Sequence, residues 1–281
     1  AIRQKEIYGY LLIPSGFAEK VGNNEEATLC YYYHNAMLSV GGEVRSTFET
    51  LLKQTSITPI VTEAVALGEE QSAIVSFLMP TSEEEFPTYN HHRNYAVYLS
   101  QPFFFVFLQV LLLLVTIYAL GSESKFGTSD EWLQAAQGNI GVAVLGKLLP
   151  YTFIFIGMGV LANAVFFGWM QIPLPCSLGV MNLVTILFIG ATQALALLLY
   201  AIFPVMGLII SVASMIGSLG ATLSGVTFPV VFMDAPVYWA SFLFPVRHFM
   251  EAVQSLLYLD ASIAYYWTNL VALLLFLLLP I

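Results

Sequence analysis

Charged residues are scarce in this sequence, and their scarcity argues against an ordinary soluble protein. They make up 10% of the 281 residues, against 58% hydrophobic residues, whereas soluble proteins carry about 25% charged residues. No Asp, Glu, Lys, Arg or His occurs between Leu148 and Met233. A globular core does not need so long an uncharged run, but several bilayer crossings of about 20 residues each do. The sequence therefore predicts an α-helical polytopic membrane protein.

Cysteines and bases are also few. Cys30 and Cys176 are the two cysteines, and they have no metal-ligand spacing and say little about the redox compartment. Nine basic residues stand against eighteen acidic ones, which gives a net charge of -9. This balance argues against nucleic acid or an anionic membrane surface as the partner of the water-soluble part.

The charges that are present gather in the first third of the chain. Residues 1–95 hold twelve of the eighteen acids and six of the nine bases. Apolar β-rich runs cover residues 7–13 and 27–34, and residues 39–54 have the periodicity of an amphipathic helix. Residues 1–95 are thus predicted to form a small α/β domain, with the polar residues 80–93 as a linker to the membrane.

The rest of the chain is apolar and is divided by prolines and short polar turns. The segment 226–260 is too apolar for a free loop and too broken by proline for one crossing helix, so we expect short helices that enter the membrane from one side. The predicted crossings cover residues 95–120, 140–169, 178–200, 205–224 and 262–281.

One crossing carries small residues at four-residue spacing, namely Ala213, Gly217, Ala221 and Gly225. Such a stripe lets another helix backbone approach closely. General packing within the bundle and a specific dimer seam would both produce it.

The polar insertion at residues 121–139 contains a predicted capping box. Thr128 can cap a helix start and Glu131 can bond back to it. Trp132 and Leu133 follow on this short helix. Apolar residues at such a place indicate either docking on the membrane surface or contact with a protein partner.

The stretch from Gly141 to Lys147 matches seven positions of the phosphate-binding loop, but the eighth is Leu148 instead of Ser or Thr. The missing hydroxyl is the one that binds magnesium, and no strand precedes the stretch. We therefore expect no nucleotide binding by this chain and no cofactor on it.

Four motifs, in order, resemble the permeases of type-2 ATP-binding-cassette exporters. They are G-x-x-x-I-P-x-x-F at residues 9–17, E-x-x-x-G-T at 123–128, G-K-x-x-P at 146–150, and the proline-broken segment at 224–249. In that family the second motif starts a cytoplasmic coupling helix, here residues 128–136. One departure is the insertion of Asp234 and Ala235, where the family has Met directly before Pro.

The resemblance implies a permease subunit whose partner ABC ATPase subunits bind ATP and magnesium. It also implies a second permease copy or close relative, and a bacterial inner membrane with residues 1–95 on the extracytoplasmic side. A further crossing is expected before Ala1, because the family's outer domain lies between its first two crossings. An uncharged lining would suit an amphipathic or lipidic molecule.

The resemblance also assigns roles to residues. Lys147 is predicted to be an interface anchor that extends its ammonium to the headgroups. The ATPase-coupling residues are Glu123, Gly127, Thr128, Glu131, Trp132 and Leu133. An outer re-entrant gate is implied for Phe228, Pro229, Pro236, Pro245, Arg247 and His248.

Three other functions remain open on the sequence alone. An ion-coupled transporter needs a titratable group at mid-membrane, and the crossings offer none apart from Glu251 or Asp260 nearby. An enzyme would need more than His91–His92 or Arg247–His248. A receptor or anchor without transport would also fit. Basic residues near the crossings do not settle the orientation, because Lys125 and Lys147 balance Arg93 and Arg247.

Overall fold

The structure is a computed structural model, and the chain forms two compact units, residues 1–95 and 96–281. Each unit is described by itself. The residues that the structure describes are 7, 9–16, 20, 29–34, 38–52, 83–88, 95–203, 205–228, 230–258, 264 and 266–280.

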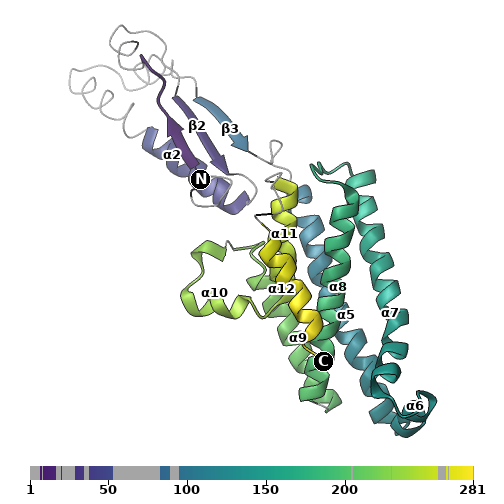
Figure 1. The fold of residues 1–281 in the computed structure, drawn as a ribbon. Helices are drawn as coiled ribbons and strands as arrows, with labels where there is room; N and C mark the ends of the chain where they lie inside the picture. Colours follow the sequence, from purple (N-terminus) through teal and green to yellow (C-terminus); the bar gives the residue numbers. More distant parts are fainter. Residues whose placement is uncertain are drawn as a thin grey trace. The chain divides into compact units, whose positions relative to one another are not determined.

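The first unit contains a three-stranded sheet with one helix against it (Figure 1). Strands β1 (Gly9–Leu12) and β2 (Leu29–His34) pair antiparallel, and α2 (Leu38–Leu52) follows β2. A Cβ on Gly9 would lie 2.8 Å from Val44 Cγ1. The absence of a side chain at Gly9 thus lets the helix approach the sheet closely.

The third strand, β3 (Glu83–Thr88), lies where the sequence predicted a linker. It pairs in parallel with β2, with Cys30 opposite Glu84. Three consecutive glutamates have low strand propensity, so local sequence gives no sign of this strand. The neighbouring β2 backbone supplies the hydrogen bonds that make it a strand.

The second unit is helical, and among its described residues four helices are long and apolar enough to cross a membrane: α5, α7 with its extension, α8 and α9. Shorter helices lie between and after them. In chain order the elements are α5 (Tyr95–Phe126), α6 (Ser129–Ala135), α7 (Ile140–Asn163), η3 (Ala164–Trp169), α8 (Leu178–Ile202), α9 (Met206–Leu223), η4 (Val230–Phe232), α10 (Ala235–Ser241), α11 (Pro245–Tyr258) and α12 (Trp267–Leu278).

Helix α5 is longer than the predicted crossing, which ended at residue 120. It continues to Phe126 and ends at Gly127, whose φ is +71°. The Thr128 amide donates to the Glu123 carbonyl at 3.0 Å, the bond that closes a helix with glycine in the left-handed region. Glu123 therefore lies on the last turns of α5 and not in a loop.

Helix α7 changes into a π-helix after Asn163. The η3 segment has six residues. π-helical turns are rare in proteins, and those that occur are often found at functional sites. The Asn163 side chain donates to Asn182 Oδ1 at 2.9 Å and to Thr185 Oγ1 at 3.0 Å. These bonds join α7 to α8 at the change of helix type.

An aromatic cluster holds the core of the bundle together. The Phe188 and Phe249 ring centroids are 4.3 Å apart, and Phe105 lies 4.8 Å from Phe249. The three rings come from α8, α11 and α5 and are fully buried. The short helix α11 is thus packed into the bundle.

The last predicted crossing is only partly matched by a helix. Helix α12 has 12 residues, about 18 Å of helix at 1.5 Å per residue, whereas the hydrocarbon core is about 30 Å thick. A full crossing over residues 262–281 stays a prediction.

The stripe of small residues packs inside this chain. Ala213 is fully buried, and a Cβ on Gly217 would lie 2.8 Å from Val110 Cγ2 of α5. Here the stripe lets α9 approach α5, which is general bundle packing.

Candidate functional site

Helix α6 links the ends of α5 and α7 (Figure 1). Polar side chains of α5, of α7 and of the residue before α6 meet there beside the Trp132 ring of α6, in a group that we call the Glu123 corner. It consists of Ser122, Glu123, Thr128, Trp132 and Lys147.

The Glu123 carboxylate is the centre of this corner. One oxygen pairs with the Lys147 ammonium of α7, and the other accepts a hydrogen bond from the Thr128 hydroxyl at the start of α6. Charge-assisted bonds of this kind are roughly twice as strong as neutral ones. One side chain on α5 therefore holds both of the next two helices.

The Lys147 ammonium has further contacts. It donates to Ser122 Oγ at 3.4 Å and lies 5.4 Å from the centre of the Trp132 ring. The sequence predicted that this side chain would extend to the headgroups. Instead it turns toward Glu123, because a carboxylate one helix away satisfies the charge better than the edge of the membrane.

The predicted capping box is not formed. Thr128 is the residue before α6, but its side chain makes no capping bond. Its hydroxyl donates to Glu123 instead. The tertiary partner replaces the local one, so Thr128 fixes α6 to α5.

Helix α6 has two different faces. Trp132 packs beside Leu120 and Leu148, on the chain's own helices. Asp130, Glu131 and Gln134 are exposed. Trp132 is only partly buried, so its predicted contact with the ATPase stays a prediction, and the exposed face of α6 is acidic and polar.

The end of α6 and the start of α7 are both closed by local bonds. The Gly138 amide donates to the Leu133 carbonyl at 2.9 Å, while Gln137 takes a φ of 55°. The Asn139 side chain accepts from the Val142 amide at 3.2 Å and caps α7. Residues 141–147 lie inside α7, so the stretch that resembles a phosphate-binding loop is helical.

The residues predicted for the outer gate are not gathered into one cluster. Pro236 lies in the first turn of α10 and Pro245 begins α11, while Phe228 is exposed. Figure 1 shows α6 at one end of the bundle, away from α10 and α11. Pro229 and the pair His91–His92 lie outside the described residues.

Arg247 and His248 tie α10 and α12 to α11. The Arg247 guanidinium is buried and lies 3.9 Å from the centre of the Phe242 ring. His248 Nε2 donates to the Phe242 carbonyl, and Nδ1 lies 3.1 Å from Asn269 Oδ1 of α12. Arg247 also lies 3.9 Å from Glu251 of its own helix, so the contacts of the pair hold α10, α11 and α12 together.

Sequence reasoning missed the buried polar contacts between crossings. Asn163 bonds to Asn182 and Thr185, and Thr152 donates to Gln193 at 2.6 Å. In the sequence these residues stand out as single polar residues inside apolar runs, which could have indicated the contacts. Within the described residues, no group of three or more His, Cys, Asp or Glu could hold a metal ion.

Comparison with known proteins identifies the family of the chain. A family model described as ABC-2 family transporter protein matches residues 1–281. Neither the curated proteins nor the solved structures contain a match to the chain. With four helices fit to cross a membrane, the chain is a multi-pass membrane component of an ABC transporter and belongs to the ABC-2 family.

Proposed function

We propose that this chain is the permease subunit of an ATP-driven exporter, which moves an amphipathic or lipidic small molecule out of the cytoplasm. A separate ATPase subunit hydrolyses ATP. The observation that carries the proposal is the Glu123 carboxylate, which binds Thr128 before α6 and Lys147 on α7.

The corner gives α6 a way to move the crossings. A push on α6 reaches α5 through Thr128 and Glu123, and it reaches α7 through Lys147. Because the three helices are joined at one carboxylate, they respond together instead of bending separately. Closure of the ATPase subunits would then select between two arrangements of the bundle, as a ligand-driven change of shape requires.

The exposed face of α9 supports a second permease copy. It carries Ser211, Ser214, Ser218 and Thr222, and each hydroxyl bonds a carbonyl of its own helix. Such a face is polar enough to line a path for an amphiphile, yet it leaves no donor unpaired in the membrane. We place this path between two copies, with α6 in the cytoplasm and residues 1–95 outside a bacterial inner membrane.

Reconstitution tests the proposal. The full-length protein and its ATPase subunit would be placed in vesicles with a fluorescent single-chain amphiphile. We expect ATP-dependent movement of the amphiphile, lost with Glu123→Gln and kept with Lys125→Gln, which removes an exposed charge two residues further along α5. Movement driven by an ion gradient without ATP would contradict the proposal.

A further inference from the structure

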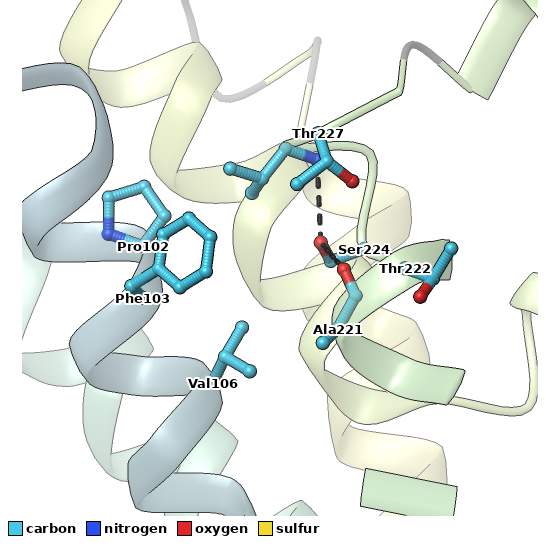
Figure 2. A pocket seen from close by; sticks show the side chains of 8 residues that line it. Pro102, Phe103, Val106, Ala221, Thr222, Ser224 and Thr227 are labelled. Carbon is cyan, nitrogen blue, oxygen red and sulfur yellow. Dashed lines mark hydrogen bonds between the residues drawn. The ribbon is translucent and has the colours of Figure 1, made fainter. Parts of the chain in front are cut away.

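A pocket of about 220 Å³ lies between α5 and the end of α9 (Figure 2). Pro102, Phe103 and Val106 form its α5 side. The opposite side comes from Ala221 of α9 and from Val226 in the turn that follows. All of these residues belong to the second unit of a single chain.

The Ser224 and Thr222 hydroxyls in the wall are already paired. Ser224 is fully buried, and its hydroxyl donates to the Ala221 carbonyl at 2.7 Å and accepts from the Val226 amide at 3.4 Å (Figure 2). The Thr222 hydroxyl bonds the Ser218 carbonyl. A polar ligand would find these two hydroxyls occupied, and apart from the exposed Thr227 the lining that remains is apolar.

Glycine shapes the far wall. Gly225 has a φ of +82°, and a Cβ there would lie 2.6 Å from Val230 Cγ2. Glycine takes this left-handed conformation without strain and leaves room for the Val230 side chain. The turn brings Val226 back over the end of α9, which closes the pocket on that side.

The position of the pocket suits the hydrocarbon region near the headgroups. Pro102 lies seven residues after the start of α5 at Tyr95, or about 10 Å along the helix. Helix α9 ends at Leu223, beside the pocket. The exposed hydroxyls of Thr222 and Thr227 border it.

We propose that this pocket binds the hydrocarbon chain of an amphiphile within one copy of the protein. Its volume is below the roughly 300–1,000 Å³ of pockets for drug-sized ligands, so it fits a narrow chain and not a bulky ring system. The headgroup lies toward Thr222 and Thr227. Only the identification of this amphiphile as cargo rests on the proposed function, since binding of the chain does not require ATP.

Photolabelling tests this site. The full-length protein in lipid nanodiscs would receive a phospholipid with a diazirine in its acyl chain, and the adducts would be mapped by mass spectrometry. We expect adducts on Val106 and Val226, which are 7% and 3% exposed and which bulk lipid cannot reach. Adducts confined to exposed residues such as Phe107 and Leu161 would overturn the proposal.

Variants fix the location. Ala221→Phe fills the pocket and should remove the adducts on Val106 and Val226, while labelling of Leu161 on α7 persists. Gly157→Phe is the matched control, because Gly157 is exposed and a Cβ there would have no other atom within 4 Å, and it should change nothing. If Ala221→Phe fails to fold, Ala221→Leu replaces it and should reduce the same adducts. Unchanged adducts in a folded variant would refute the site.

The effect of ATP on the adducts shows whether the bound hydrocarbon chain belongs to cargo or to a membrane lipid. In the complex with its ATPase subunit, adducts that fall on addition of ATP identify cargo, whereas adducts indifferent to ATP identify a resident membrane lipid. Both outcomes require the pocket. Labelling of Val106 and Val226 in a complex that transports nothing would retain the pocket and reject the proposed function.

Discussion

Glu123 makes two bonds that could not both survive the loss of its charge. In Glu123→Gln, the Lys147 ammonium loses its charged partner and keeps the Ser122 hydroxyl and the Trp132 ring beside it. We expect the stimulation of ATP hydrolysis by amphiphile to fall about fivefold or more, the lower range of a coupling between sites. Assembly with the ATPase should persist, because Glu123 lies beneath α6 and not on its free face.

The matched control for Glu123→Gln is Lys125→Gln, two residues further along α5. Lys125 is exposed and lies beside the Phe126 ring. The measurement is ATPase activity of the reconstituted complex with and without amphiphile. Equal loss in both variants would show that charge at the end of α5, and not the Glu123 pair, is responsible.

Variants of Thr128 distinguish a role in joining α6 to α5 from a role in capping α6. Its hydroxyl donates to Glu123 and does not cap α6. Thr128→Val should therefore reduce coupling as Glu123→Gln does, while Thr128→Ser should restore it. Stimulated ATP hydrolysis of the two variants is the test. If Ser fails to restore activity although the protein folds, the hydroxyl is not the link.

At the scale of the helix, one face of α6 packs against the other helices of the chain and the opposite face is available to a partner. Trp132 is half-buried, so Trp132→Ala should cost about 2 kcal/mol, roughly half of the 3–5 kcal/mol of a fully buried change. Denaturant-induced unfolding of the purified protein measures this free energy. Glu131→Ala, on the free face, should leave stability unchanged and weaken ATPase binding. If Trp132→Ala weakened ATPase binding and Glu131→Ala lowered stability, the assignment of the two faces of α6 would be reversed.

The junction of α7 with its π-helical extension makes a second prediction. Asn163→Ala removes two bonds to α8, and such bonds in membrane proteins average about 0.6 kcal/mol each. The free energy of unfolding should therefore fall by about 1 kcal/mol. Ser214→Ala is the control, because its hydroxyl bonds only the Ile210 carbonyl of its own helix. Equal thermal midpoints for the two variants would show that the bonds do not hold the helices.

The sequence predicted the elements whose signals are local. Helix α2, strands β1 and β2, and the long apolar helices follow from periodicity and composition. Strand β3 was missed because parallel pairing with β2 is a non-local event that overrides the low strand propensity of Glu83–Glu85.

The candidate site divides in the same way. The short helix at residues 129–135 was visible from its polar context and start. The bond from Thr128 to Glu123 and the ion pair with Lys147, 24 residues away, exist only once α5 and α7 lie side by side. Local sequence therefore predicted that Thr128 caps the short helix and that the Lys147 ammonium extends to the headgroups.

At the scale of the whole molecule, the proposed exporter requires that its ATPase reach α6. The acidic and polar residues Asp130, Glu131 and Gln134 are exposed there, so the facing surface of the ATPase should be basic. Asp234, before α10, is equally exposed but belongs to the segment that we place on the outer side.

The most direct measurement is photocrosslinking from these two positions. A photoreactive amino acid would replace Asp130 in one variant and Asp234 in another, in the full-length protein assembled with its ATPase subunit. We expect the ATPase to be captured from position 130 and not from position 234. Capture from position 234, or no capture from position 130 in a complex that hydrolyses ATP, would contradict the assignment of α6 as the element on which the ATPase acts.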